Sequence, residues 1–456
     1  MKRFNFNFVV LLLISIMVFF IAGQQSGSAQ LAGSFPKGRY TPHGYIDNPW
    51  HSMAMNRSGV IRSVPPLGFG YWHRSFKGSY KAGPRGHVNY LSLLQMGVLI
   101  NGKPFAERGD FEKNGIQLYS AYHTKNVMSY DWNYQQVNFS FQYFLPRENS
   151  LACRVVLENN SPEEKEVILN AAHLYGLWEI EWWGSNGLSS QYLAEPDVSI
   201  SKIWAYGDVF GLASDWQTAA SGATASENQK QDWLGGRAGR FSKNASVRND
   251  GPIYSLQRYQ VILPPHSQLS GFIYLIRGKT EAGVLSELQA ARKEIASQLK
   301  RLLAEDEKFW SECPQLSGDW PANWKHGWVY DWETLRMNIR QPIGIFKHPW
   351  DAMQVHSPRL VLGETALDMM MMSYADPALA KEVIYGTFAD ALAPNVPCAR
   401  EDGSVNMIGA DGSECGTAPM WGFPFHVIQS IYAATGDSVW ITHLYPYLKA
   451  YLDWWL

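Results

Sequence analysis

The chain has 456 residues, of which 46% are hydrophobic and 18% charged, which is typical of a globular protein with two or three domains. The net charge of -2 at pH 7 gives no basic surface for nucleic acid or acidic lipid, so we expect neither as a partner. Aromatic residues make up 14% of the chain. A surplus of Trp and Tyr in a neutral protein favours sugar binding, because indole faces pack against the C–H faces of pyranose rings.

The N-terminal residues 1–29 have the pattern of a secretory signal peptide. A basic start at Lys2 and Arg3 is followed by the apolar run 8–22 and by small polar residues up to Ala29. The alternative is a membrane anchor, but a span needs roughly 20 apolar residues and this run is shorter. We therefore expect a secreted or periplasmic protein with no membrane association after cleavage.

Residues 40–280 are predicted to form a β-sandwich domain. Four segments have strand-like composition, namely 151–157, 167–171, 259–263 and 271–276. A turn at 159–162 separates the first two, and Pro264-Pro265 separates the second two, so we expect each pair to be joined locally. Strands at this spacing without intervening helices favour a sandwich. The polar, small-residue stretch 216–249 is predicted to be a long surface excursion.

The apolar period then changes to that of a helix. A stripe from Leu288 to Phe309 predicts a linker helix within 281–312, with charged residues on its opposite face. Residues 313–456 are predicted to be the helical domain. Its helix signals are Pro321 at a first turn, the apolar segment 360–372, and the cap Asp376.

The C-terminal residues 451–456 lie inside an apolar helical pattern with no cap or polar tail. We therefore expect the chain to be an N-terminal fragment of a longer protein.

Four cysteines are present in a chain that we expect to be exported. Cys398 and Cys415 flank one Gly-rich loop and are the predicted disulfide pair, while buried free thiols are the alternative for all four. No CxxC spacing occurs, so neither zinc nor redox chemistry is predicted.

Five segments of the C-terminal third carry a family resemblance: 348–351, 376–381, 393–397, 413–421 and 445–455. Together with the order of sandwich, linker helix and helix pairs, they resemble glycoside hydrolases with a six-hairpin (α/α)6 toroid. The group comprises family 63, the mannosylglycerate hydrolases and, more distantly, the trehalases. The resemblance implies a multidomain fold in which an N-terminal β-sandwich precedes an incomplete (α/α)6 toroid. A Gly-Thr-Ala-Pro run within 413–421 departs from the trehalase pattern and argues against trehalose as a substrate.

By this resemblance Trp350 stacks on a sugar ring, Asp351 accepts hydrogen bonds from its hydroxyls, and Asn395 contacts the same sugar. The predicted substrate-binding residues are Trp350, Asp351, Asn395 and Trp421, with Arg400 and Glu414 as weaker candidates. Each has a structural alternative. Asp351 suits a helix N-cap, the two tryptophans suit a core, Asn395 suits a turn, and Arg400 and Glu414 suit solvated loops.

No catalytic acid or base is assigned within the chain, because the resembled enzymes carry both at positions expected beyond Leu456. No cofactor is predicted, since the Asp/Asn-rich segments 402–406 and 411–414 lack a complete calcium-loop pattern. The sequence therefore predicts an exported inverting glycoside hydrolase acting on α-linked gluco- or manno-configured sugars, present as a fragment without its catalytic pair. The alternatives are a non-catalytic carbohydrate-binding protein, and a glycoside phosphorylase or polysaccharide lyase of the same architecture.

Overall fold

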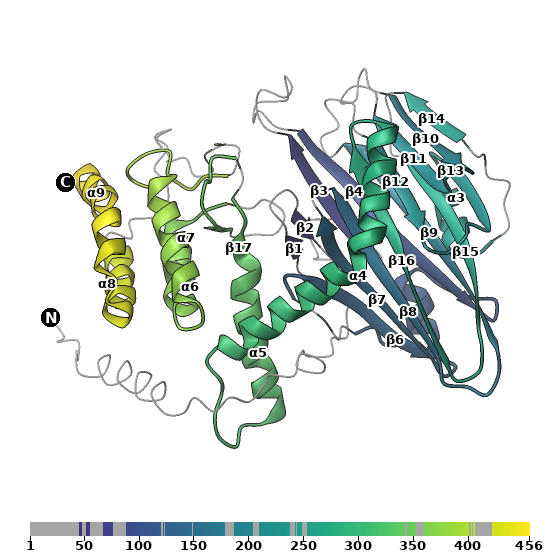
Figure 1. The fold of residues 1–456 in the computed structure, drawn as a ribbon, viewed down its shortest axis with the longest axis horizontal. Helices are drawn as coiled ribbons and strands as arrows, with labels where there is room; N and C mark the ends of the chain where they lie inside the picture. The colour runs from purple at the N-terminus through teal and green to yellow at the C-terminus, as the bar shows by residue number, and fades with distance from the viewer. Residues whose placement is uncertain are drawn as a thin grey trace.

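The computed structural model describes most of the two predicted regions. The described residues are 45–47, 52–54, 67–75, 88–119, 122, 124–147, 149–177, 187–203, 209–237, 242, 244–248, 253–342, 344–352, 359–400, 403, 405 and 422–456. The N-terminal segment 1–29 lies outside them. A β-rich part occupies one end of the molecule, and helices α5 to α9 follow it at the other end (Figure 1).

Two antiparallel sheets make up the β-rich part. The first has the order β1-β2-β3-β4-β9-β15-β13, with β5 paired to β4. Its strands are β1 (Tyr45–Asp47), β2 (Ser52–Ala54), β3 (Gly68–Ser75), β4 (Val88–Ile100), β5 (Lys103–Phe105), β9 (Lys165–Leu177), β13 (Ala220–Thr224) and β15 (Ile253–Leu263). The second has the order β14-β10-β11-β12-β16-β8-β7-β6. Its strands are β6 (Val127–Tyr134), β7 (Val137–Arg147), β8 (Ser150–Asn159), β10 (Gly187–Leu193), β11 (Val198–Ile203), β12 (Val209–Ser214), β14 (Asn244–Arg248) and β16 (Ser267–Gly278).

The sheets form a sandwich because alternate side chains of their strands enter a shared core. In β8, Leu151, Cys153, Val155 and Leu157 are buried, which is the period of two expected for a strand with one inward face. They belong to one apolar cluster with residues of the first sheet, such as Leu169 of β9. The predicted β-sandwich is therefore confirmed.

All four predicted segments are strands, and the predicted turns join them in twos, but the joined strands lie in different sheets. β8 lies in the second sheet and β9 in the first, and the same change of sheet separates β15 from β16. The Asn159 side chain links the two crossings. Its Nδ2 donates to the carbonyl oxygens of Glu163, Leu263 and Pro264 at 2.7, 3.2 and 3.0 Å, so it holds both turns together where the chain crosses between sheets.

The stretch 216–249 is not a plain surface excursion, which corrects the expectation from its composition. It contributes β13, β14 and the helix α3 (Glu227–Leu234). Trp233 and Leu234 of α3 are buried against the first sheet, and Ser226 caps the helix by accepting from the backbone N–H of Gln229 at 3.3 Å. A short helix, α2 (Arg108–Lys113), lies nearby and follows β5.

The helix α4 (Glu281–Glu312) occupies the segment predicted to be a linker. Thr280 caps it by accepting from the backbone N–H of Gly283 at 3.0 Å. One face of α4 packs on the outer surface of the second sheet, through a cluster that includes Val284, Leu288 and Ile295. The helix then continues beyond the sandwich toward α5 (Figure 1).

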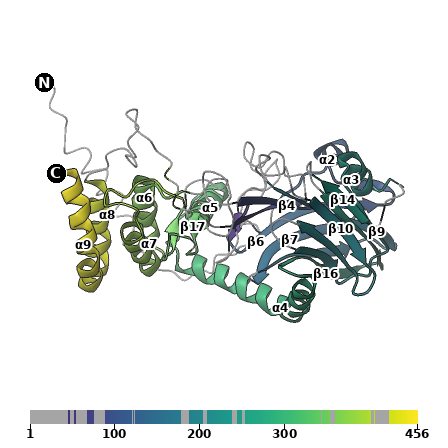
Figure 2. The ribbon, with the colours of Figure 1, turned by 90° about the horizontal axis from the view of Figure 1, so that it is seen from above.

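The helical part follows in chain order. It contains α5 (Ala322–Asn338), β17 (Ile339–Arg340), β18 (Trp350–Asp351), α6 (Leu362–Met372), α7 (Pro377–Ala389), α8 (Phe423–Thr435) and α9 (Ser438–Trp455). Asp376 caps α7 and Asp437 caps α9 through their carboxylates, while Gly436 ends α8 with a positive φ of 66°. The helices extend away from the sandwich in sequence order (Figure 2).

A buried polar cluster joins the sandwich to the helices, and we call it the junction cluster. Its members are Thr124, Asn126, Asp306, Glu333 and Arg336. The Asp306 carboxylate accepts from Thr124 Oγ1 at 2.7 Å and from Asn126 Nδ2 at 2.8 Å. Arg336 Nη1 donates to Asp306 at 2.6 Å and lies 3.4 Å from Glu333. Burial raises the pKa of Asp306 to about 7, although the Arg336 guanidinium opposes this shift.

No helix in the described part of the chain combines the length and the apolar composition that a bilayer span requires.

Candidate functional site

Asp351 lies on the short strand β18, directly after α5 and a return loop. β17 pairs antiparallel with β18, so that Ile339 is opposite Asp351 and Arg340 is opposite Trp350. Asp351 lies in this strand pair, and the N-cap of α6 is Val361, so Asp351 does not cap α6. The strand pair instead fixes the direction of the Asp351 side chain, with no exposed surface.

The Asp351 carboxyl is surrounded by a cluster of titratable groups, which we call the Asp351 cluster: Asp351, Arg340, Glu364, Thr365 and Asp368. Burial, and then the charge of Asp368, raise the pKa of Asp351 to about 8. The Thr365 hydroxyl and the Arg340 guanidinium oppose this shift. Neither carboxyl oxygen of Asp351 meets a donor in hydrogen-bonding geometry among the described residues. Asp351 is therefore protonated at neutral pH, with unused capacity to donate and accept.

The α6 helix supplies the other acidic members of this cluster. Asp368 follows Thr365 by three residues and Glu364 by four, so each of these two lies next to Asp368 on the surface of α6. Burial raises the pKa of Asp368 to about 6, while a hydrogen bond from Asn338 lowers it. Perturbed carboxyls in a buried group are a recurring feature of functional sites.

Trp350 lies in the core of the helical part and is 3% exposed. Its ring stacks on Phe346, with ring centres 4.2 Å apart and an interplanar angle of 19°, and its Nε1 donates to the Gln341 carbonyl at 3.2 Å. The indole thus braces the loop that precedes Asp351. Its predicted stacking on a sugar stays a prediction.

Asn395 and Arg400 lie on the segment after α7, and both are buried. The backbone at Ala399 pairs with Leu360, which brings this segment to the start of α6. Burial raises the pKa of Cys398, and the charges of Arg359 and Arg400 oppose that shift. Arg400 is therefore not in a solvated loop, which was its structural alternative.

The segment that carries Cys398 and Arg400 lies beside the start of α6, because Ala399 pairs with Leu360, and α6 supplies Thr365 and Asp368 to the Asp351 cluster. The structure thus brings Asp351 and Arg400 into one region of the helical part. Trp421, Glu414 and Cys415 lie outside the described residues, so their predicted roles stay predictions. Cys398 forms no disulfide with a described residue.

Arg340, Thr365 and Asp368 were not predicted as site residues from the sequence. Their signal was available, because Thr365 and Asp368 are polar residues in the otherwise apolar segment 360–372. A polar side chain inside a buried helix calls for polar surroundings, and here Thr365 and Asp368 both lie close enough to Asp351 to influence its pKa.

The described residues contain no group of three or more His, Cys, Asp or Glu side chains arranged to hold a metal ion. Most of the two Asp/Asn-rich segments considered for calcium lies outside the described residues.

No protein-family model matches the sequence, and the curated proteins contain no match. A bacterial glucoamylase complexed with acarbose has a similar structure, with a TM-score of 0.53 and 9% identity over 93% of this chain and 59% of that chain. The family GH92 α-mannosidase of Bacteroides thetaiotaomicron gives a TM-score of 0.42 and 8% identity over 89% of this chain and 57% of that chain. A human-microbiome protein designated a putative kojibiose phosphorylase gives a TM-score of 0.41 and 10% identity over 88% of this chain and 58% of that chain.

The chain spans less than two thirds of the length of each of these proteins. At such low identity the glucoamylase match concerns the fold alone. The predicted resemblance is confirmed at that level: the chain has a β-sandwich followed by helices of an incomplete (α/α)6 toroid, as in the part of the glucoamylase that it matches.

Proposed function

We propose that the Asp351 cluster forms one wall of a sugar subsite in a glycoside hydrolase that acts on α-linked gluco- or manno-configured substrates by inversion. The observation that carries this proposal is the fully buried Asp351 carboxyl, whose pKa is about 8 and whose oxygens lack hydrogen-bonding partners among the described residues. A protonated carboxyl both donates and accepts, as a sugar hydroxyl requires. The glucoamylase with the same fold was solved with acarbose, which makes an α-glucoside-like ligand the first probe.

The proposal assigns no catalytic acid or base to this chain. Inversion requires two carboxyl groups roughly 6.5–9.5 Å apart on opposite sides of the scissile bond. The role given to Asp351 is to bind and orient a hydroxyl. Because its side chain has no exposed surface, a hydroxyl reaches it only when neighbouring segments move.

Calorimetric titration with acarbose, maltose and methyl α-mannoside tests this role. The wild-type chain should bind at least one of these probes, and Asp351→Leu, which keeps an approximate side-chain volume, should weaken binding at least about tenfold. Asp351→Asn should retain most of the affinity at pH 7, because an amide also donates and accepts. Above pH 8 the wild type should lose affinity as Asp351 ionises, whereas Asp351→Asn should not.

The exposed Asp453 of α9 provides the matched control, and Asp453→Asn should bind as the wild type does. Equal affinity of the wild type and Asp351→Leu would contradict the subsite. For the reaction itself, NMR of the first product anomer distinguishes inversion from retention, and a requirement for phosphate would identify a phosphorylase. Probe binding without turnover would favour the non-catalytic carbohydrate-binding alternative.

We also propose that the chain is exported, on the basis of the basic and apolar pattern of residues 1–29. Expression of the full chain with a C-terminal tag, followed by N-terminal sequencing of the extracytoplasmic protein, should reveal a new terminus close to residue 30. Retention of the uncleaved chain inside the cell would contradict export.

A further inference from the structure

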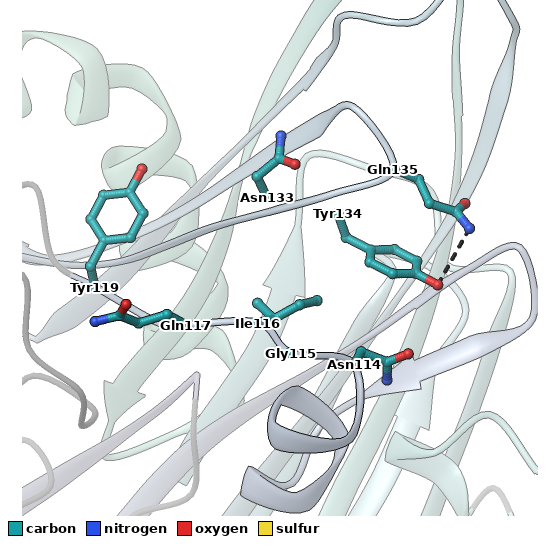
Figure 3. A pocket seen from close by; sticks show the side chains of 8 residues that line it. All are labelled: Asn114, Gly115, Ile116, Gln117, Tyr119, Asn133, Tyr134 and Gln135. Carbon is teal, nitrogen blue, oxygen red and sulfur yellow. Dashed lines mark hydrogen bonds between the residues drawn. The ribbon is translucent and has the colours of Figure 1, made fainter.

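The sandwich carries a pocket of about 500 Å³, far along the chain from the Asp351 cluster. It lies between the segment that follows α2 and the turn that joins β6 to β7, and residues 114–117, Tyr119 and 133–135 line it. Tyr119 and Tyr134 lie at opposite ends, with Ile116 and Gln117 between them (Figure 3). Its volume is within the range of roughly 300–1,000 Å³ that small-molecule sites occupy.

The lining side chains are uncharged, yet most of them carry hydrogen-bond donors and acceptors. They include four amides and two phenols: Asn114, Gln117, Asn133, Gln135, Tyr119 and Tyr134. Each amide offers two donors and an acceptor, which matches the mixed demand of adjacent hydroxyl groups, and phenol rings offer flat apolar surface for sugar C–H groups. A smaller pocket of about 340 Å³ on the other side of α2 has a different character, because Glu107, Asp110 and Arg237 line it. The larger pocket is thus suited to a neutral polyol and not to an ion.

Contacts behind the lining hold the Tyr134 end of the pocket in place. The Tyr134 ring packs on Phe105, with ring centres 4.9 Å apart, and the Lys103 ammonium lies 5.7 Å from the Tyr134 ring centre. Gln135 Nε2 donates to the Tyr134 hydroxyl at 3.3 Å, and Gln135 Oε1 accepts from Asn101 Nδ2 at 2.6 Å. Asn101 belongs to the β4–β5 turn, so hairpin turns from both sheets brace this wall.

The β6–β7 turn holds its two central residues in an unfavourable conformation. Gln135 and Gln136 have φ values of 48° and 63°, in the left-handed region that two-residue hairpin turns require and that Asn-Gly satisfies best. A pair of glutamines there costs conformational energy, and such strain gathers at sites where a side chain is needed. Gln135 lines the pocket, so a need for its amide explains why this residue occupies a strained position.

We propose that this pocket is a second carbohydrate site, which holds one neutral hexose unit of an oligosaccharide on the sandwich, separately from the proposed site in the helical part. The phenol of Tyr119 and the amides of Gln117, Asn133 and Gln135 contact the sugar. A single hexose offers few atoms, so the dissociation constant is expected to be about 1 mM.

The test uses the full chain with the Asp351→Leu substitution, which weakens binding at the proposed helical subsite, and it compares variants that differ only in the sandwich pocket. Maltose and galactose are titrated as neutral probes, and galacturonate serves as the charged probe. At least one neutral sugar should bind at about the millimolar level, and Tyr119→Ala/Gln117→Ala should weaken that binding at least tenfold. The control Tyr374→Ala/Gln268→Ala, which changes exposed residues outside the pocket, should bind as its parent does.

Two further readouts locate the site. Hydrogen exchange should slow at 114–119 and 133–136 when the sugar binds. The double substitution Gln135→Asn/Gln136→Gly removes the backbone strain of the turn, so it should raise the melting temperature. It also shortens the Gln135 side chain in the pocket, so it should weaken sugar binding. The proposal is overturned if no neutral sugar binds the Asp351→Leu chain, if the pocket variant binds as well as its parent, or if only galacturonate binds. The effect of Asp351→Leu on acarbose binding tests the helical subsite only. The effect of Tyr119→Ala/Gln117→Ala tests the sandwich pocket, so the two proposals can fail independently.

Discussion

Asp306 at the junction and Asp351 in the candidate site are both buried carboxyls, but they differ in how many hydrogen-bond donors surround them. Asp306 accepts from Thr124 and Asn126 and pairs with Arg336 at 2.6 Å. Neither oxygen of Asp351 meets a donor in hydrogen-bonding geometry among the described residues. The two carboxyls therefore differ in their partners far more than in their depth.

This difference supports a structural role for Asp306 and motivates the binding role that we propose for Asp351. Saturated hydrogen bonding fixes Asp306 between the sandwich and the helices, and it leaves no capacity for another molecule. The unmet capacity of Asp351 has a cost in stability that a structural role would not explain. Burial together with perturbed pKa is thus an incomplete criterion for a site, because both groups meet it. The count of satisfied hydrogen bonds distinguishes them.

The largest expected effect belongs to the junction. Asp306→Ala removes the partner of Arg336 and the acceptor for Thr124, so it should lower the free energy of unfolding by about 3–5 kcal/mol. Urea unfolding measures this loss. Arg301→Ala on the same helix removes an exposed ion pair with Glu305 and should cost less than about 1 kcal/mol. Similar losses for the two variants would show that the junction cluster is not a structural lock.

A smaller effect is expected from the second carboxylate of the junction. Trp310 Nε1 donates to Glu333 at 2.7 Å, and Trp310→Phe deletes that donor beside a buried carboxylate. The free energy of unfolding should fall by about 2–3 kcal/mol. Trp324→Phe at a 59% exposed position should change it by no more than about 0.5 kcal/mol. If Trp310→Phe unfolds at the wild-type urea concentration, Glu333 does not depend on this hydrogen bond.

The third prediction concerns Asp351, and the size of its effect on stability depends on pH. The folded pKa of about 8 exceeds the unfolded value of roughly 3.9, so between these values the folded state holds a proton that the unfolded state has released. Wild-type stability therefore falls as pH rises through this window, and Asp351→Asn lacks that loss. From pH 5 to pH 8 the variant should gain about 3–4 kcal/mol relative to the wild type, because each pH unit in this window changes the difference by about 1.4 kcal/mol.

Urea unfolding at both pH values measures the gain at Asp351, with Asp453→Asn as the exposed control. A difference between Asp351→Asn and the wild type that does not change with pH would mean that Asp351 is already ionised at pH 5. The contrast with the saturated Asp306 would then lose its basis.

Local patterns were sufficient to predict the elements but not their partners. The caps Asp376 and Asp437 and the strand composition around Leu151 act over a few residues, and the structure has the expected helices and strands there. Strand pairing depends on long-range contacts that composition does not encode, so the change of sheet after β8 was missed. The candidate site divides in the same way. Asp351 was found by its motif, whereas Arg340 and Asp368 join it only through the pairing of β17 with β18 and the placement of α6.

The buried amide of Asn159 has a consequence for how the sandwich assembles. One side chain bonds to the turn after β8 and to the turn after β15, although the residues it joins are 104 and 105 positions apart. Neither turn can reach its final geometry without the other, so the two passages between sheets should form in a single cooperative step. One side chain therefore connects both crossings between the sheets, and Asn159→Ala would remove the hydrogen bonds to both turns at once.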